Sequence, residues 1–311
     1  MPDILITEFM LESEVDRLAQ DYDVAYLPDL VSKQDEIPQH MPGVRGLIVR
    51  NATQVRGAVL EAADKLECVG RLGVGLDNID MDACAARDIK VFPAIGANSD
   101  SVAELAMGAI YALFRRSYHS TDDVTAGKWP RLALMGREVQ GKTLGIIGLG
   151  WTGQALAWRA RGNGMQRIAY DPWVPADDPR WEDCKVERAA TLDELLPKCD
   201  AVSVHVPLTD DTRDLFDAAT IAKMKDRALL LNLSRGGIVN EQALVDALKS
   251  EKLWGAFTDV FVEEPLTSPN IFEGVPNLIC TPHVGPRTEE GEGKVSSVTA
   301  DAVLNCLKGN A

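Results

Sequence analysis

The sequence has few cysteines and no long apolar stretch. A transmembrane helix needs about 18 to 20 consecutive apolar residues, and no segment of the 311-residue chain approaches that length. The six cysteines stand apart, without a C-x-x-C pair, so their spacing indicates neither a disulfide framework nor a zinc site. The first ten residues also lack the basic region of a signal peptide. We therefore expect a protein of the reducing cytoplasm, with no metal site and no membrane partner.

Basic residues are scarce as well. The chain has 32 lysines and arginines against 47 aspartates and glutamates, which gives a formal net charge of −15. This balance argues against a nucleic-acid partner, because phosphates bind basic surfaces. It also repels small anions at long range, so an anionic ligand requires a local basic pocket. Solubility explains the acidity most simply, and adaptation to high salt is the alternative.

Apolar runs and helical patterns alternate along the chain. This alternation is typical of βαβ units around a parallel sheet, and the length suits two domains of about 150 residues each. In the first block, strands are predicted at 4–7, 24–27, 46–50, 68–72 and 91–92, with helices at 12–20 and 53–65. In the second block, strands are predicted at 143–149, 167–170, 201–206, 228–233, 255–259 and 278–280, with helices at 154–161 and 241–249.

Two further helices complete the prediction. A long helix begins near Ser99, with Ser99 or Ser101 as its N-cap, and a final helix covers 292–307. Six strands in one parallel sheet are the architecture of a dinucleotide-binding domain. The fold class is therefore α/β, with doubly wound parallel sheets.

A glycine motif follows the first strand of the second block. Gly148, Gly150 and Gly153 fit G-x-G-x-x-G, after an apolar strand and before a helical pattern. The first glycine permits a tight turn, the second lets the backbone approach a pyrophosphate, and the third lets helix and strand pack closely. The helix N-terminus at Trp151 and Thr152 would then hold the phosphates. A glycine-rich turn without a cofactor is the alternative.

An acidic residue indicates which dinucleotide binds. Asp171 ends the next strand, eighteen positions after Gly153. A carboxylate there accepts hydrogen bonds from the ribose hydroxyls and repels a 2′-phosphate. The sequence therefore predicts NAD rather than NADP as the cofactor.

Three residue types needed for 2-keto acid reduction occur in the second block. His283 lies in TPHVG, Arg235 in NLSRGGIVN, and Glu263 and Glu264 in DVFVEEP. A histidine supplies a proton near neutral pH, and an arginine clamps a carboxylate with two hydrogen bonds. A carboxylate beside the histidine favours the imidazolium and so keeps the acid loaded.

The order of GLGWTG, Asp171, HVPLT, NLSRGG, DVFVEEP and TPHVG resembles the D-2-hydroxyacid dehydrogenase family. Within it, the chain is most similar to the 3-phosphoglycerate dehydrogenase-like branch, in a short form without a regulatory domain. The resemblance extends to RNATQV, GRLGVGLDNID and GANSDSVAELAM in the first block. It implies two Rossmann-like domains, with a discontinuous substrate domain at 1–97 plus 287–311 and an NAD-binding domain at 98–286.

The resemblance also implies catalytic roles. Arg235 clamps the substrate carboxylate and polarises the keto oxygen, and His283 is the acid–base residue. Glu264 is the partner of His283, whereas Glu263 falls one place off the motif and is a solvated neighbour. Asp259 anchors the nicotinamide carboxamide.

Other positions are assigned to ligand binding by the same resemblance. Those of the cofactor site are His205, Pro207, Thr212, Leu233, Ser234 and Gly285, in addition to the glycine motif, Asp171, Arg235, Asp259 and His283. Those of the substrate site are Arg50, Asn51, Arg71, Gly73, Val74, Gly75 and Asn98, in addition to Arg235 and His283. Packing is the simpler role for His205, and we expect His40 and His119 at the surface. Residues 119–141 resemble a dimerisation arm, which implies a homodimer or a tetramer.

The substrate's tail is the least determined feature. Arg50 and Arg71 end strands of the first block, at positions that face an anionic tail in the phosphoglycerate branch, and Arg131 would reach across a dimer. Pairing with a surface carboxylate is the alternative role for such arginines. The branch carries more basic residues around Arg131 than the Leu132–Leu134 found here, and commonly a serine in place of Asn51.

These features favour a compact dianion of the 3-phosphoglycerate or 3-sulfolactate type as the substrate. Reduction of glyoxylate, hydroxypyruvate or another 2-keto acid is the alternative, and an NAD(H)-sensing binding protein is the remote one. Formate dehydrogenation is disfavoured, because the histidine of those enzymes is paired with an amide and here Glu264 supplies a carboxylate. Turnover that is selective for a dianion would distinguish the first interpretation from the second.

Overall fold

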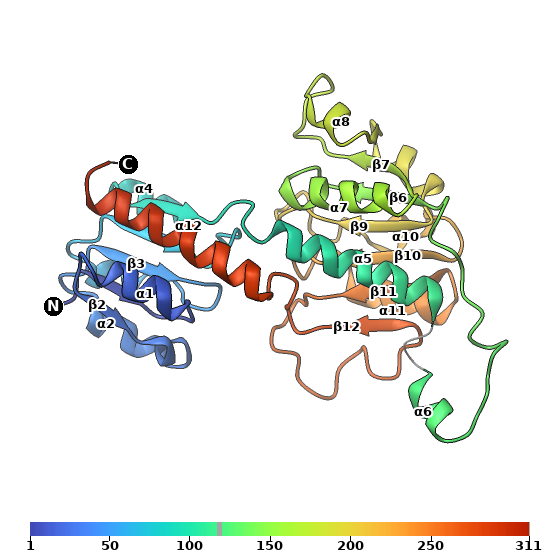
Figure 1. The fold of residues 1–311 in the computed structure, drawn as a ribbon, viewed down its shortest axis with the longest axis horizontal. Helices are drawn as coiled ribbons and strands as arrows, with labels where there is room; N and C mark the ends of the chain where they lie inside the picture. The colour runs from blue at the N-terminus through green and yellow to red at the C-terminus, as the bar shows by residue number, and fades with distance from the viewer. Residues whose placement is uncertain (117–119, 311) are drawn as a thin grey trace. The chain divides into compact units, whose positions relative to one another are not determined.

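The structure is a computed structural model that describes residues 1–116 and 120–310. It divides into two compact units, which are described separately (Figure 1). Unit 1 consists of Met1–Asn98 and Arg287–Ala311, and unit 2 is Ser99–Pro286. The first boundary lies one residue from the expected one. His119 lies outside the described residues, and His40 is half-buried at the end of a short helix.

The sheet of unit 1 has five parallel strands in the order β2-β1-β3-β4-β5. The strands are β1 (Ile4–Ile6), β2 (Val24–Tyr26), β3 (Gly46–Val49), β4 (Cys68–Arg71) and β5 (Lys90–Pro93). All five were predicted from their apolar runs. Four of the predictions run one residue too far, because the chain leaves the hydrogen-bonded ladder one residue earlier than predicted. The residues that leave it begin the loops at the carboxyl edge of the sheet.

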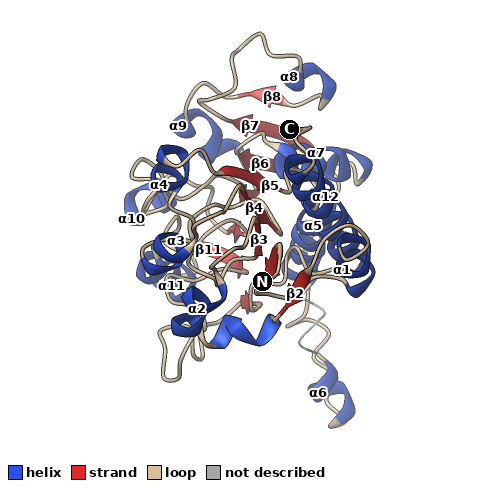
Figure 2. Cartoon of the chain, turned by 90° about the vertical axis from the view of Figure 1, so that its left-hand side faces the viewer, coloured by secondary structure: helices blue, strands red, loops and turns tan. Residues whose placement is uncertain are grey.

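Helices cover both faces of this sheet. Figure 2 shows α1 and α12 on one face and α2, α3 and α4 on the other. Their bounds are α1 (Glu12–Leu18), α2 (Ile37–His40), α3 (Ala58–Ala62), α4 (Met81–Ala86) and α12 (Glu289–Leu307). A Cβ at Gly70 would lie 2.7 Å from Thr299 Cγ2 and 2.8 Å from Val303 Cγ2, so glycine on β4 allows α12 to pack closely on the sheet.

The prediction for 53–65 was wrong in length. Only Ala58–Ala62 is α-helical, because Val55 instead pairs with Ile79 in an isolated bridge. Gly57 then adopts a positive φ of 49° just before the helix. The spacing of apolar residues correctly predicted which side chains are buried, but it did not indicate the bridge between Val55 and Ile79.

The sheet of unit 2 has seven parallel strands in the order β12-β11-β10-β9-β6-β7-β8. They are β6 (Thr143–Ile147), β7 (Gln166–Tyr170), β8 (Glu187–Arg188), β9 (Ala201–Val204), β10 (Ala228–Asn232), β11 (Leu253–Thr258) and β12 (Leu278–Cys280). Sequence analysis predicted six of these. It missed β8, whose two residues are exposed and polar and therefore show no apolar pattern.

Helices also cover both faces of this second sheet. They are α5 (Ser99–Arg115), α6 (Thr121–Thr125), α7 (Trp151–Gly162), α8 (Arg180–Asp183), α9 (Leu192–Leu195), α10 (Ala218–Ala222) and α11 (Glu241–Lys249). Helices α5 and α7 pack on one face around a core that includes Ile110 and Ile146, and α10 and α11 cover the other. Ser99 and Ser101 both lie inside α5, so the prediction that one of them is the N-cap was wrong.

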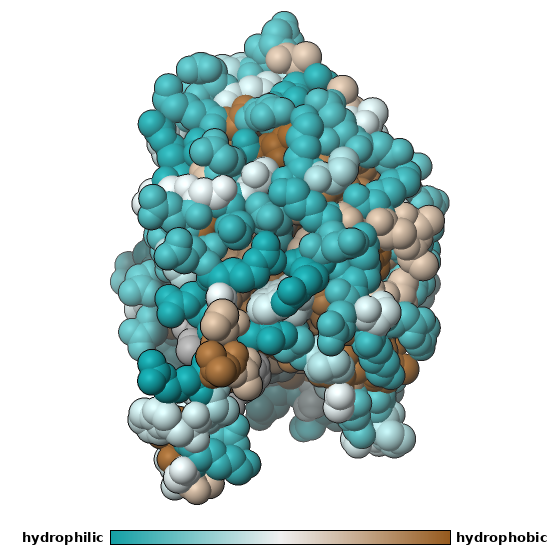
Figure 3. Space-filling view, turned by 90° about the vertical axis from the view of Figure 1, so that its right-hand side faces the viewer, coloured by the Kyte–Doolittle hydropathy of each residue, from teal (hydrophilic) through white to brown (hydrophobic). Residues whose placement is uncertain are grey.

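The exterior of unit 2 is mostly hydrophilic. Figure 3 shows a face on which hydrophobic side chains are scattered among many polar ones, as the acidic composition leads one to expect. None of the helices within 1–116 and 120–310 combines the length and the hydropathy that a membrane span requires.

Candidate active site

The glycine motif forms the turn between β6 and α7. Gly148 has a φ of +93°, and a Cβ there would lie 2.5 Å from the carbonyl oxygen of His205. A Cβ at Gly153 would lie 2.1 Å from the carbonyl oxygen of Gly148. Both positions therefore require glycine for backbone packing. A Cβ at Gly150 would meet nothing within 4 Å, which leaves open space above the first turn of α7.

Asp171 is fixed beside this turn. Its carboxylate accepts hydrogen bonds from the N–H groups of Leu149 at 2.8 Å and Trp173 at 2.9 Å. The two bonds use one position on each oxygen, and a carboxylate oxygen can accept more than one hydrogen bond. Asp171 thus keeps acceptor capacity at the end of β7, adjacent in the sheet to β6 and its glycine turn.

His205 follows β9 and has a structural setting. Its N–H donates to Ile147 O at 2.7 Å, and its Nε2 lies 2.8 Å from Ser203 Oγ. Burial lowers the pKa of His205 to about 4, so the ring is neutral at pH 7. Nearby, Thr212 Oγ1 donates to Pro207 O at 2.6 Å and closes the following turn.

The loop after β10 carries Arg235. Ser234 Oγ donates to Val204 O at 2.8 Å, and Asn232 Nδ2 donates to Arg235 O at 2.9 Å. Leu233, which lies between Asn232 and Ser234 in the sequence, is buried. A Cβ at Gly236 would lie 1.9 Å from Phe261 O, so glycine lets this loop lie directly on the loop after β11.

Glu264 and His283 form a pair on the next two loops. His283 Nδ1 lies 2.8 Å from Glu264 Oε2, and Phe261 N–H donates to Glu264 Oε1 at 3.0 Å. Partial burial works to raise the pKa of Glu264, but the hydrogen bonds from His283 and Phe261 and the nearby charges of His283 and Arg235 outweigh it. The net effect is a pKa below the usual value of a glutamate. Glu263, next to it, is exposed.

Asp259 shapes the turn that carries His283. Its buried carboxylate accepts hydrogen bonds from Thr281 Oγ1 at 2.6 Å and from the N–H groups of Val284 at 2.8 Å and Gly285 at 2.7 Å. His283 has a φ of +54°, in the left-handed region that non-glycine residues seldom occupy. Its N–H donates to Asp259 O at 2.8 Å, so Asp259 stabilises this conformation. A carboxamide contact of Asp259 stays a prediction.

These side chains share one edge of the sheet. Arg235, Glu264 and His283 follow β10, β11 and β12, which are neighbours in the strand order, and the glycine turn and Asp171 follow β6 and β7. All of them lie beyond the carboxyl ends of parallel strands, where ligands bind in open α/β sheets.

In unit 1, the expected substrate loop after β3 is held by two buried polar residues. Glu8 accepts hydrogen bonds from the N–H groups of Arg50 and Thr53, both at 2.8 Å. Asn78 Nδ2 donates to Arg50 O at 3.2 Å and to Thr53 O at 2.6 Å. Sequence analysis missed Glu8 and Asn78. An acidic residue two positions after a buried strand was the available signal for Glu8.

Arg71 lies against the second expected substrate loop, at Gly73. Its Nη1 donates to Leu72 O at 3.0 Å, and a Cβ at Gly73 would fall 1.7 Å from that Nη1. Gly73 has a φ of +142°, so only glycine fits beside the guanidinium. Val74 is exposed, and Gly75 and Asn98 are half-buried.

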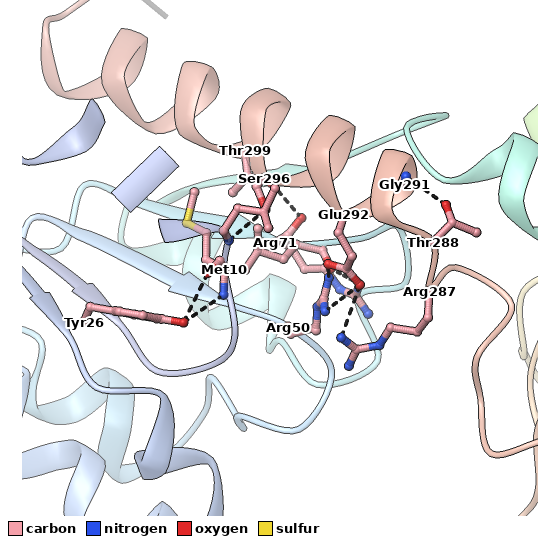
Figure 4. Close-up of polar contacts among 12 residues, drawn as sticks. Met10, Tyr26, Arg50, Arg71, Arg287, Thr288, Gly291, Glu292, Ser296 and Thr299 are labelled. Carbon is pink, nitrogen blue, oxygen red and sulfur yellow. Dashed lines mark hydrogen bonds and ion pairs between the residues drawn. The ribbon is translucent and has the colours of Figure 1, made fainter. Parts of the chain in front are cut away.

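Arg50 is paired with Glu292, on the first turn of α12. Its Nη1 donates to Glu292 Oε1 at 3.1 Å and its Nη2 to Oε2. Arg287 Nη1 also donates to Glu292 Oε1, at 3.2 Å. Figure 4 shows these side chains together, with Arg71 nearby. The alternative that Arg50 pairs with a carboxylate is thus correct for Arg50, although the side chain of Glu292 is only 12% exposed. Sequence analysis missed Glu292 and Arg287.

Comparison with known proteins identifies the family. Residues 107–285, more than half of the chain, match the model of the D-isomer specific 2-hydroxyacid dehydrogenase NAD binding domain. The chain belongs to this family. As an NAD-dependent 2-hydroxyacid dehydrogenase, it interconverts a 2-hydroxy acid and the 2-keto acid by hydride transfer.

Individual relatives agree with the family. The chain is 50% identical to (S)-sulfolactate dehydrogenase of Chromohalobacter salexigens over 307 residues, which cover 99% of both chains. It is 38% identical to D-3-phosphoglycerate dehydrogenase of Methanocaldococcus jannaschii over 99% of this chain and 58% of that protein. The crystal structure of TT0316 protein from Thermus thermophilus superposes with a TM-score of 0.85 at 31% identity, over 98% of this dehydrogenase and 97% of that chain.

Proposed function

We propose that this dehydrogenase acts on a 2-hydroxy acid with a second anionic group on carbon 3, of the 3-sulfolactate type. The observation that carries the proposal is the arginine cluster of unit 1. Arg50 and Arg71 are each only 7% exposed and end adjacent parallel strands, and the more exposed Arg287 lies just before α12. In a chain with a net charge of −15, such a cluster of arginines, two of them buried, is suited to an anion.

The identity to a sulfolactate dehydrogenase supports a sulfonate as that anion. A sulfonate or phosphate presents several oxygens that match the planar fork of an arginine. The loops that carry the cluster are rigidly built, since Glu8 and Asn78 hold the backbone around Arg50 and Gly73 makes room for Arg71. Asn51, Val74, Gly75 and Asn98 complete the proposed substrate loops. 3-Phosphoglycerate also carries an anionic group on carbon 3, with more negative charge than a sulfonate, and is the related substrate to test.

For the reaction itself, we assign three residues of unit 2. Arg235 clamps the substrate carboxylate and polarises the oxygen on carbon 2. In oxidation, His283 Nε2 would accept the hydroxyl proton. Bound NAD would supply the hydride acceptor for carbon 2, so that the keto acid, NADH and a proton balance the reaction. Glu264 accepts a hydrogen bond from Nδ1, which leaves Nε2 for the substrate and stabilises the imidazolium that forms.

The proposed cofactor contacts lie on the same edge. The open space above Gly150 and the N–H groups at Trp151 and Thr152 suit the pyrophosphate, and the remaining acceptor capacity of Asp171 suits the ribose hydroxyls. Asp171 would repel a 2′-phosphate, so NAD is preferred over NADP. The further proposed contacts are Gly148, Gly153, His205, Pro207, Thr212, Leu233, Ser234, Asp259 and Gly285.

A homodimer, or a tetramer built from it, is the proposed assembly. The segment from α6 to the start of β6 exposes Trp129 by 73%, Leu132 by 82% and Met135 by 65%, and Figure 1 shows α6 standing apart from the sheet. Large exposed apolar side chains of this kind favour burial against a partner. We propose a second copy as that partner, with Arg131 of the same segment directed to the anion site, and a cytoplasmic location without a nucleic-acid or membrane partner.

One observation favours a second candidate function. Glu292 already neutralises Arg50, so the site can accommodate a substrate that brings no second charge. Glyoxylate and hydroxypyruvate are acids of this kind. Initial rates with NAD and a panel of 3-sulfolactate, 3-phosphoglycerate, glycerate, malate and lactate separate the two. Selective turnover of a compact dianion supports the proposal, and selective turnover of glycerate or lactate contradicts it. No turnover at all, with NADH still bound, would instead favour an NAD(H)-sensing protein.

A further inference from the structure

Glu292 occupies the position in the arginine cluster that a bound anion would be expected to take. Both of its carboxylate oxygens accept from Arg50, and Oε1 also accepts from Arg287. The side chains of Arg50 and Glu292 are only 9% and 12% exposed. The pair is therefore largely shielded from water, and it is stronger than an exposed ion pair would be.

This geometry conflicts with simple binding of a tail by Arg50. A guanidinium offers two edges for a two-point contact with an anion, Nη1/Nη2 and Nε/Nη2, and Glu292 fills the edge formed by Nη1 and Nη2. A sulfonate that uses the same edge must first separate Glu292 from Arg50. The nearby Arg287 offers the displaced carboxylate an alternative partner, because it already contacts Oε1 at 3.2 Å and its side chain is 45% exposed.

We propose that Glu292 is an internal counter-anion that the tail of the substrate displaces from Arg50, and that it thereby selects for a substrate with a charged tail. This inference rests on the proposed function. Without a substrate, Glu292 prevents Arg50 from lying buried and unpaired, which would be costly. A dianionic substrate replaces the Arg50–Glu292 pair with a pair between Arg50 and its own anionic tail. An uncharged tail cannot displace Glu292, so the Arg50–Glu292 pair stays in place.

The position of Glu292 on α12 fits this role. It lies on the first turn of a 19-residue helix that begins at Glu289 and is capped by Thr288, whose Oγ1 accepts from Gly291 N–H at 2.9 Å. A helix N-terminus attracts a carboxylate, so the first turn of α12 is a favourable place for this side chain. The α12 backbone need not move, because a change of side-chain rotamer separates the two groups.

Glu292→Gln tests the inference, because it removes the charge and keeps the size and one acceptor oxygen. We expect the KM for 3-sulfolactate to fall about tenfold, which corresponds to ~1.4 kcal/mol, since the tail no longer competes with a carboxylate. The KM for lactate should change less than twofold. Glu290→Gln is the matched control, because it removes the same charge from an exposed position on the same turn and should leave both KM values unchanged.

A second measurement does not depend on turnover. Inorganic sulfate should raise the Tm of the Glu292→Gln enzyme more than that of the wild type or of Glu290→Gln, with chloride at equal ionic strength as the reference. If Glu292→Gln folds poorly, Glu292→Asp is the second variant, because it withdraws the carboxylate by one methylene group. It should change the KM for 3-sulfolactate and the effect of sulfate on Tm in the same direction, but by less.

The outcomes separate the inference from the function on which it rests. The wild-type panel alone decides whether a dianion is the substrate. If Glu292→Gln raises the KM for 3-sulfolactate, as loss of an arginine would, then Glu292 orients Arg50 for the tail and the inference is wrong. An unchanged ratio of the two KM values, together with an unchanged effect of sulfate on Tm, also overturns it.

Discussion

His283 Nδ1 and Glu264 Oε2 lie 2.8 Å apart, on the loops that follow two neighbouring strands of one parallel sheet. The bond fixes which ring nitrogen carries the proton toward Glu264 and leaves the other for chemistry. Asp259 holds the turn on which His283 sits, in a backbone conformation with positive φ. The buried Asp259 and the hydrogen-bonded Glu264 therefore determine the position of the imidazole.

Replacing His283 by alanine should lower kcat by about 10²- to 10⁴-fold, the usual contribution of a general acid–base. The affinity for NADH, measured by fluorescence titration, should stay nearly constant, because the proposed pyrophosphate and ribose contacts follow β6 and β7. In the wild type, oxidation should speed up and reduction slow down as pH rises, since His283 must be neutral in one direction and protonated in the other. A variant that retained its rate would rule out His283 as the proton donor.

The pKa of Glu264 predicts how stability changes with pH. Because hydrogen bonds and nearby positive charges lower that pKa below its usual value, the ionised form is favoured in the folded protein. The resulting stability is present above the unfolded pKa and is lost as pH falls through the lower folded pKa. The Tm difference between the wild type and Glu264→Gln should therefore shrink as pH falls from 7 toward 3.

Glu263→Gln is the matched control for this experiment, because its side chain is adjacent and exposed. It should follow the wild type at every pH. A Tm difference for Glu264→Gln that grew in acid would contradict the lowered pKa.

Asp171→Ala should weaken NAD binding about 10- to 100-fold, as expected for the loss of hydrogen bonds to a charged group worth roughly 1.5–3 kcal/mol. The affinity for NADP should fall much less, because the substitution removes the repulsion of the 2′-phosphate together with the hydrogen bonds. The ratio of kcat/KM values for the two cofactors measures the change. An unaltered preference for NAD would mean that another residue discriminates against the phosphate.

Arg50→Ala and Arg71→Ala should each raise the KM for 3-sulfolactate by about 30-fold or more, since loss of one partner of a buried charge pair costs roughly 2–5 kcal/mol. The KM for lactate should rise far less. Arg56→Ala, an exposed arginine in the same unit, should affect neither substrate. Equal increases in KM for 3-sulfolactate and lactate would contradict an anion site at Arg50 and Arg71.

The sequence alone predicted every strand of the described residues except β8, and it singled out the residues that we propose act on carbon 2. Buried parallel strands are continuous apolar runs, and Gly148, Asp171, Arg235 and His283 lie in short motifs whose chemistry is local. Glu292 escaped prediction because its partner Arg50 is 242 residues away along the chain. An acidic residue in the first turn of a helix is too common to indicate a binding site.

Glu8 escaped for the same reason. Its three N–H donors lie at Arg50, Ala52 and Thr53, up to 45 residues along the chain, and no local pattern predicts which loop a buried carboxylate will hold. Short elements were also beyond prediction. The two residues of β8 have polar side chains, and α3 is shortened by a bridge between Val55 and Ile79 that only the tertiary fold brings together.

We propose that the enzyme distinguishes 2-hydroxy acids by the charge on carbon 3. The most direct test is the kcat/KM of the wild-type enzyme with NAD for 3-sulfolactate, divided by the same quantity for lactate. We predict a ratio of about 10² or more, because at least one buried charge-assisted contact is available only to the sulfonate. A ratio near one, or a preference for lactate, would contradict the account.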